Sequence, residues 1–443
     1  MRRHTARWLK PPRRRYAYLV KPYTMASLAD RLANARHRKR VLKDIFEAIE
    51  REDFEAAAGH CLKRFESRSQ FWLYAARIGA ELLLRLNRFD DARKLYDAII
   101  EAKTVPWARL GVARTELGSG NTSAARRTLE TLIGDIPDHA DSHDVMGRVQ
   151  MDLGEIEGAL ATYRTAARLT PGCLLRAQRC GCLAYYAGQR PEALKQLEQT
   201  MAQGLRSKLF DMLSLVLIAL MRFDNRDSKG LKYAFDAMSS EMERHPNSKR
   251  LQRFDVLFQC LRFMLDKRVA DALERARDLT RRASEQEDFD LEAASLLLAL
   301  WVRLAAMIEL EEMSQLVTQL GLRFCTTKAA TEVLVAMCEG NLAVAEELRN
   351  CHARIFGIAE TAMRHSMRGS ARVGVELLIQ QGEATRNAKL IDMAGLVLKR
   401  HSEKIDDAES LSERILQLHT RFVKPLGAGN RQKRSAGGLA LRS

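Results

Sequence analysis

Apolar residues recur every three or four positions along most of the chain, which is the spacing that lines one face of an α-helix. In residues 140–174 this pattern is interrupted once, at Gly154 and the polar residue after it, and then resumes. Residues 174–205 repeat the arrangement around Gly188. Because a glycine and a polar residue between two amphipathic segments indicate a turn, the pattern predicts two consecutive helical hairpins.

A fixed offset of 34 residues relates these two hairpins. Small residues at matching positions allow the two helices of a hairpin to approach closely. Pro137 and Pro171 each end a unit, because proline is tolerated at a helix start but not in a helix interior. A repeat of this length is typical of stacked helical pairs, each of which buries its apolar face against the next. The recurring positions are Pro137, Gly147, Gly154 and Ala159, which return as Pro171, Gly181, Gly188 and Ala193.

The hairpin pattern extends beyond these two units. We expect about five units over residues 38–205, one of which opens at Trp107 and Gly111. Helical periodicity continues through residues 206–423 in a weaker form, which predicts degenerate repeats, with a plain α-helical bundle as the alternative. The turns expected in that part are marked by His245-Pro246-Asn247, Gly340-Asn341, Gly369-Ser370 and Gly382.

These residues closely resemble the tetratricopeptide-repeat family. The resemblance is carried by the Trp-x-x-Leu-Gly opening at Trp107 and by the run through Gly154, Tyr163 and Ala166. It implies an all-α solenoid of helical hairpins that binds protein partners on the concave surface formed by the first helix of each unit. The residues with an expected structural role in the repeats are Trp107, Gly111, Gly147, Gly154, Ala159, Pro171, Gly181, Gly188 and Ala193.

Side chains on the first helices are the candidates for binding a peptide in that groove. Their spacing places them on the face that the resemblance assigns to partners, although any one of them could be merely exposed. The candidates are Arg114, Arg148, Asp152, Gln178, Tyr185 and Tyr186.

Charge is concentrated at the two ends of the 443-residue chain. The net charge of +16 consists of +13 over residues 1–43 and +5 over residues 424–443, which leaves −2 for the body. A basic groove along the whole array, as an RNA-binding solenoid would need, is therefore not predicted. We expect residues 1–15 and the tail 424–443 to be disordered and basic. A nucleic-acid-binding protein that uses these ends is a less favoured alternative.

Residues 16–37 resemble the last strand and last helix of a bacterial response-regulator receiver domain. A β-like run ends at Lys21 and Pro22, and Thr24 could cap a helix whose apolar face is Met25, Leu28, Leu32 and Ala35. In that family the lysine contacts the phosphoryl group and the proline shapes its loop. Residues 1–29 contain no acid, so the carboxylates that such a site needs for Mg²⁺ and phosphoryl transfer are missing.

Two explanations of this incomplete receiver are possible: it has been lost, or the start codon lies inside a longer gene. The resemblance then implies the output module of a bacterial two-component phosphorelay that is not itself phosphorylatable. A general assembly scaffold without a signalling role is the remaining alternative.

No set of residues predicts catalysis. Cys180 and Cys182 point to different faces of one helix, and with Cys173 they lack a fourth metal ligand. His139 and His143 have a spacing that can bind metal, but they fall at the start of a unit, where a structural role is favoured. The glycine-rich runs at 118–121 and 427–430 lack a following Gly-Lys-Ser/Thr.

The remaining features indicate a cytoplasmic protein. The eight cysteines form no disulfide framework and are expected to be reduced. The longest apolar stretch, residues 212–221, is far shorter than the ~20 residues that a bilayer requires. We therefore expect a non-enzymatic cytoplasmic scaffold with protein partners and with no cofactor, metal, membrane span or small-molecule substrate.

Overall fold

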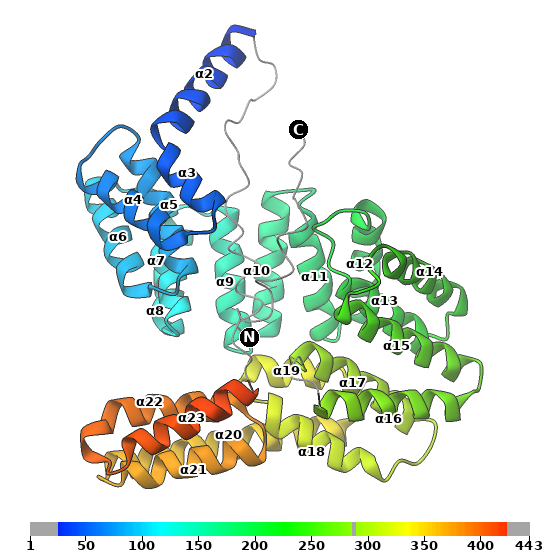
Figure 1. Cartoon of the computed structure of the whole chain (residues 1–443). Helices are drawn as coiled ribbons and strands as arrows, with labels where there is room; N and C mark the ends of the chain where they lie inside the picture. The colour runs from blue at the N-terminus through cyan, green and yellow to red at the C-terminus, as the bar shows by residue number, and fades with distance from the viewer. Residues whose placement is uncertain (1–24, 286–288, 423–443) are drawn as a thin grey trace. The chain divides into compact units, whose positions relative to one another are not determined.

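The computed structural model describes residues 25–285 and 289–422, which contain 22 α-helices, one short 3-10 helix and no strand. Most of the helices pair into ten successive hairpins, from α3–α4 to α21–α22 (Figure 1). The helices are α2 (Met25–Val41), α3 (Lys43–Glu50), α4 (Phe54–Glu66), α5 (Trp72–Arg85), α6 (Phe89–Ala102), α7 (Pro106–Gly118), α8 (Thr122–Asp135), α9 (Ala140–Asp152), α10 (Ile156–Leu169), α11 (Leu174–Tyr186), α12 (Arg190–Gly204), α13 (Leu213–Asp224), α14 (Ser228–Arg244), α15 (Lys249–Leu265), α16 (Val269–Glu285), α17 (Leu291–Ala305), α18 (Glu312–Phe324), α19 (Lys328–Ala336), α20 (Leu342–Met367), α21 (Ala371–Ala384), α22 (Ala388–His401), η1 (Ser402–Lys404) and α23 (Ala408–Phe422).

The hairpins fall into two compact units. Unit 1 comprises residues 1–153 and 158–176, and unit 2 comprises residues 154–157 and 177–443. The division falls inside the array predicted for residues 38–205 and not at its end. The odd-numbered helices α3 to α21 are the first helices of their hairpins, and the even-numbered helices α4 to α22 are the second.

One turn geometry joins the two helices in nine of the ten described hairpins. Shortly after the first helix ends, a residue adopts the left-handed conformation, with φ between 52° and 86°. The next residue comes directly before the second helix, and where it is Asp or Asn its side chain accepts a backbone N–H bond, as Asn121 does from Ala124. The left-handed positions are Glu52, Asn87, Gly120, Gly154, Gly188, Arg226, Lys267, Gly340 and Arg386.

The left-handed positions show that the hairpin persists where the sequence signature fades. They are 33 to 35 residues apart through Gly188, and then 38 and 41 residues apart through Arg226 and Lys267. Five residues after the left-handed position, a buried alanine allows the second helix to pack closely, except where Leu231 or Ile391 replaces it. The buried alanines are Ala57, Ala92, Ala125, Ala159, Ala193, Ala272 and Ala345.

Glycines inside the first helices are placed by close packing. A Cβ added at Gly147 would lie 2.5 Å from the ring of Tyr163, and one added at Gly181 would lie 2.5 Å from Leu197. Such distances are too short for a methyl group, so only glycine allows α9 to approach α10 and α11 to approach α12. The 34-residue repetition of glycine therefore reflects a repeated contact.

One sequence prediction needs correction, and others fall outside the described residues. Gly382 does not mark a turn: it lies inside α21, where an added Cβ would be 2.6 Å from Ile391. Lys21 and Pro22, with the strand expected before them, lie outside the described residues, as do residues 1–15 and 424–443.

Helix α2 forms where a helix was expected, but it runs on to Val41, past the predicted boundary at residue 37. Its predicted apolar face is mostly unpacked. Ala35 is buried, whereas Met25 is 78% exposed and Leu32 is 49% exposed.

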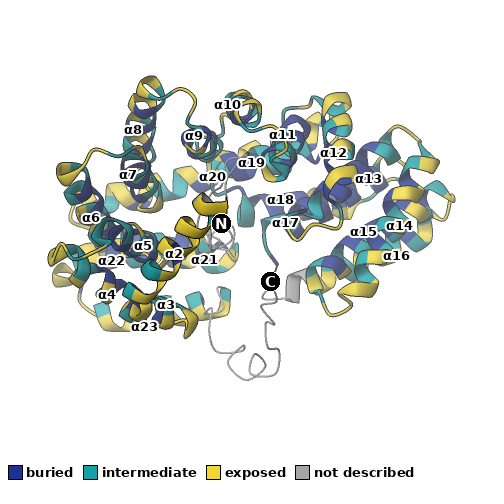
Figure 2. Ribbon diagram, turned by 90° about the horizontal axis from the view of Figure 1, so that it is seen from above, coloured by how far each residue is buried: buried dark blue, intermediate teal, exposed yellow. Residues whose placement is uncertain are grey.

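Unit 2 has two first helices that are buried on every side. Residues 214–221 of α13 and 293–304 of α17 are buried without interruption (Figure 2). A helix that is apolar all round is typical of a protein interior. These two helices therefore contribute core, and not an open groove, to unit 2.

Gly188→Ala tests the turn geometry. The Cβ would meet nothing within 4 Å, so the substitution changes only the backbone preference at φ +76°. We expect a loss of about 1–2 kcal/mol in the free energy of unfolding, measured by urea denaturation. Ala187→Gly, one residue earlier at an ordinary φ, is the control, and an equal loss in both variants would contradict the explanation.

Candidate functional site

Unit 1 presents a row of charged and aromatic side chains across two neighbouring first helices, α5 and α7. The guanidinium of Arg77 on α5 lies 5.2 Å from the ring centroid of Trp107 on α7. Further along the same two helices, Arg114 Nη1 on α7 lies 3.1 Å from Glu81 Oε1 on α5. We call these four residues the first-helix strip.

Packing beneath the strip fixes its geometry. Tyr96 on α6 is fully buried, and its ring meets that of Trp107 edge-on at 6.4 Å. The same ring occupies the space where a Cβ of Gly111 would lie, only 2.2 Å away. Gly111 therefore brings α7 against α6, and Trp107 is held with one part in the core and one part at the surface.

The strip remains accessible despite these contacts. Arg77 is exposed, Trp107 is half-buried, and the side chains of Arg114 and Glu81 are 37% and 28% exposed. An exposed ion pair of this kind contributes little to stability. Arg77, Arg114 and Glu81 are thus ordered by contacts within the strip, whereas Trp107 also packs against the core.

Two further predicted groove residues lie on α9 of unit 1. Arg148 and Asp152 are half-buried and one helical turn apart. Burial raises the pKa of Asp152, and the charge of Arg148 opposes this increase. On the same helix, Asp144 and Asp141 both pair with Arg176, at 2.8 and 2.7 Å from its Nη2.

The three predicted groove residues on α11 belong to unit 2, and two of them are not available to a ligand. Gln178 is 4% exposed, and in the amide orientation that satisfies both ends it donates to the Leu209 carbonyl and accepts from the Asp211 N–H. Tyr185 is completely buried, under the guanidinium of Arg190 at 3.5 Å. Tyr186 is half-buried, and burial raises its pKa well above the ordinary value.

A buried ionic cluster explains why Tyr185 is internal. Arg303 on α17 donates from Nε to Asp224 at the end of α13, at 2.8 Å, and its Nη2 lies 3.3 Å from Glu339. Arg190 at the start of α12 also reaches Glu339, at 3.2 Å, and donates to the Ala336 carbonyl at 2.7 Å. The cluster ties together segments that are 146 residues apart within unit 2.

The pKa values in this cluster follow from burial and charge. Burial by itself would lower the pKa of Arg303, but its interactions with Asp224 and Glu339 raise the pKa above its ordinary value. Burial raises the pKa of Glu339, the charge of Asp224 adds to this, and Arg190 and Arg303 offset it in part. The arrangement joins α12, α13, α17 and the turn after α19 within unit 2.

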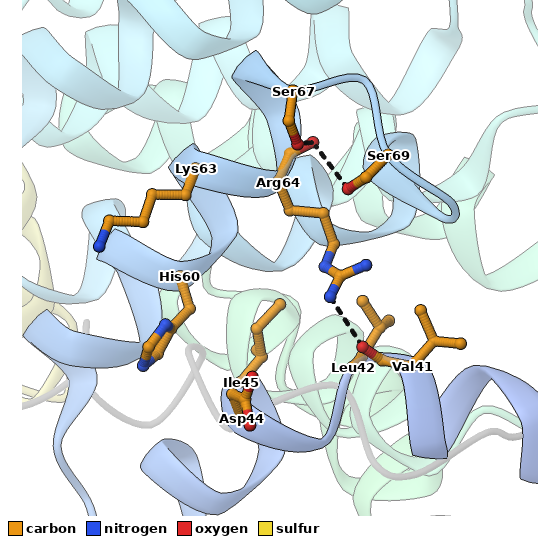
Figure 3. A pocket seen from close by; sticks show the side chains of 9 residues that line it. All are labelled: Val41, Leu42, Asp44, Ile45, His60, Lys63, Arg64, Ser67 and Ser69. Atoms are coloured by element: carbon orange, nitrogen blue, oxygen red, sulfur yellow. Dashed lines mark hydrogen bonds between the residues drawn. The ribbon is translucent and has the colours of Figure 1, made fainter.

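A cavity of about 210 Å³ lies in unit 1 between the α2–α3 junction and the end of α4. Figure 3 shows Arg64 reaching from α4 to this junction, where Nη2 donates to the Val41 carbonyl at 2.8 Å. His60 and Lys63 stand beside it on the same helix. The cavity is lined by Val41, Leu42, Asp44, Ile45, His60, Lys63, Arg64, Ser67 and Ser69.

A comparison with protein-family models identifies the repeat. Residues 83–149, from the end of α5 through most of α9, match the tetratricopeptide-repeat model. The chain contains tetratricopeptide repeats. The match covers α7, which carries Trp107 and Arg114 of the first-helix strip, together with Gly111 beneath it.

A comparison with solved structures returns matches at low sequence identity and low TM-score. YrrB, described as a TPR protein with an unusual peptide-binding site, is 17% identical with a TM-score of 0.32, covering 40% of this chain and 88% of its own. A tetratricopeptide repeat protein from Parabacteroides merdae is 12% identical with a TM-score of 0.41, covering 61% and 95%. Cut9–Hcn1 of the APC/C is 12% identical with a TM-score of 0.35, covering 90% and 92%. A search of curated proteins found no match.

Neither these matches nor the described residues support the receiver remnant. The matches concern helical repeats, and the described ranges contain no strand.

The histidines considered as metal ligands have structural roles in the tetratricopeptide hairpin. His139 contacts the hydroxyl of Ser142 at 2.6 Å, and His143 Nε2 donates to the Pro137 carbonyl at 2.8 Å. Both bonds hold the start of α9. No group of three or more potential metal ligands occurs in residues 25–285 and 289–422.

Most of the cysteines are buried. Cys180 is buried, and burial raises the pKa of Cys182 to about 12. None of the eight cysteines, all of which lie in the described ranges, forms a disulfide. Across those same ranges, no helix combines the length and apolarity that crossing a bilayer requires.

Sequence reasoning missed Arg77 and Glu81, the partners of Trp107 and Arg114. A signal for Glu81 was present, because Glu81, Arg114 and Arg148 each lie six residues before a left-handed turn residue. The signal was hidden because the turn residue after α5 is Asn87 and not glycine.

Proposed function

We propose that the first-helix strip of unit 1 is the docking surface of a protein–protein interaction scaffold. The observation that carries this proposal is the exposed Arg77 held over the half-buried Trp107. Tryptophan and arginine dominate the energetics of protein interfaces because they combine a large contact area with directional polar groups. An aromatic ring fixed from below is also pre-organised, which lowers the entropic cost of binding.

The charge of the strip favours an acidic segment as the partner. Arg77 and Arg114 contribute two positive charges, and Glu81 offsets one of them. A carboxylate of the partner could pair with Arg77, which makes no ion pair in the described structure. The spacing over two adjacent helices suits an extended peptide that crosses them.

The test uses peptides selected on the full chain from a random dodecamer display library. We expect the selected peptides to be enriched in Asp and Glu. Arg77→Ala should weaken their binding by roughly 30-fold, or about 2 kcal/mol, measured by isothermal titration calorimetry. The substitution removes an exposed side chain and should leave the fold unchanged.

Arg262→Ala is the matched control. Arg262 is also an exposed arginine over an aromatic ring, 5.4 Å from that of Phe235, but it belongs to unit 2. Its replacement should leave the affinity unchanged. If both variants bind the selected peptides as tightly as the wild type, the strip is not the docking surface.

A more specific role as the output module of a phosphorelay has no further support. It rests on Lys21 and Pro22, which lie outside the described residues, and no contact of unit 1 adds to it. A general scaffold is the function that the described residues support.

A further inference from the structure

A second surface of unit 1, separate from the first-helix strip, is formed where α2 docks on α4 and the residues that follow it. Three contacts hold it there: Arg64 Nη2 donates to the Val41 carbonyl at 2.8 Å, His37 and Gln70 side chains meet at 2.9 Å, and Arg38 lies over the Tyr74 ring at 4.6 Å. These contacts bring the basic end of α2 next to the basic end of α4.

The cations of this surface are largely unneutralised. Arg36, Lys39 and Arg40 on α2 are exposed, and in residues 25–285 and 289–422 no carboxylate pairs with them. Their spacing of three and four residues places them on one side of the helix, with neighbouring Cβ atoms about 5–6 Å apart. On α4, Lys63 is exposed and likewise has no ion-pair partner in the described ranges.

The cavity of Figure 3 lies where these two basic segments meet. It is lined by Lys63, Arg64 and His60, with Asp44 as its one acidic residue, while the hydroxyls of Ser67 and Ser69 donate to the Arg64 carbonyl. Ammonium, guanidinium and hydroxyl groups are the donors that bind phosphate oxygens. The bond from Arg64 to Val41 fixes the guanidinium at the cavity, whereas no such bond restrains the ammonium group of Lys63.

We propose that this surface binds single-stranded nucleic acid, with one phosphate in the cavity and others along α2. The end of α2 carries five basic residues in succession, Arg36 to Arg40, of which Arg36, Lys39 and Arg40 are exposed and Arg38 lies over the Tyr74 ring. A helix that lies on a lipid surface needs instead a continuous apolar face, which this end of α2 lacks. The body of the chain is near neutral, with a net charge of −2 over residues 44–423, so the excess positive charge lies towards the ends of the chain.

The test measures the binding of a fluorescein-labelled oligo(U) to the full chain by fluorescence anisotropy at several salt concentrations. We expect log K to fall linearly with log salt concentration. Arg40→Gln/Lys63→Gln should weaken binding by about tenfold at low salt and reduce the slope by about 0.7 for each phosphate that is no longer neutralised. Neither side chain belongs to the buried core, so circular dichroism should show an unchanged fold.

Lys208→Gln/Lys232→Gln is the matched control, because it removes the same charge from exposed positions of unit 2. It should bind oligo(U) like the wild type. Equal weakening in both double variants would show that only net charge matters and would overturn the site. Equal affinity for poly-glutamate, or tighter binding to phosphatidylserine vesicles, would overturn the nucleic acid as the partner.

Discussion

Replacing Arg303 by methionine should lower the free energy of unfolding of unit 2 by about 3–5 kcal/mol. Its side chain is 4% exposed and neutralises Asp224 and Glu339, which converge on it from α13 and from the turn after α19. Without the guanidinium, Asp224 loses this partner and Glu339 keeps only Arg190, in a region of low dielectric. The cost is the desolvation of an unpaired charge, which exceeds the energy of the missing hydrogen bonds.

Amide hydrogen exchange of α13, α17 and α19 is the suitable measurement, because a chain of two units need not unfold in one step. Arg303→Met/Asp224→Asn removes the carboxylate that has lost its partner, leaves the Arg190–Glu339 pair in place, and should recover much of the stability. Arg372→Met is the surface control: Arg372 pairs with Glu376 at 3.0 Å and is half exposed, so its replacement should cost less than about 1 kcal/mol. Similar costs for Arg303→Met and Arg372→Met would contradict the role of the cluster.

Replacing Trp301 by alanine should cost about 3–5 kcal/mol in the same unit. Trp301 is 2% exposed and is the largest fully buried side chain of the described residues. Its indole Nε1 also donates to Thr280 Oγ1 at 2.9 Å, which joins α17 to α16. Alanine therefore creates a cavity and leaves the hydroxyl of Thr280 without this partner.

Trp301→Phe separates the two contributions, because it keeps most of the apolar volume and removes the indole N–H. We expect it to cost clearly less than Trp301→Ala, in urea unfolding followed by circular dichroism. An effect of Trp301→Ala below about 1 kcal/mol would show that α17 is not the centre of unit 2.

Much of the fold could be predicted from the sequence because the repeat requires small residues at fixed positions. Gly147 and Gly181 are glycine because a second-helix side chain occupies the place of their Cβ, and Gly188 because its backbone is left-handed. The later hairpins were harder to recognise because Arg226 and Lys267 adopt the same backbone conformation without being glycine. The spacing of apolar residues alone could not show that Arg226 and Lys267 are turn positions.

The candidate site was only partly predictable. Spacing placed Arg114 on the face shared by first helices, where it meets Glu81. The same reasoning failed at Tyr185 and Gln178, because other segments of the chain cover them: Arg190 stacks on Tyr185, and the Asp211 backbone binds Gln178. A local pattern records which face of a helix a residue occupies, but not what another segment places over that face.

Hydrogen–deuterium exchange of the full chain, with and without a display-selected acidic peptide, tests the central claim most directly. The proposed function predicts slower exchange in α5 and α7, around Arg77 and Trp107, and disappearance of that protection in Arg77→Ala at the same peptide concentration. Protection confined to other helices, or protection that survives Arg77→Ala, would contradict it.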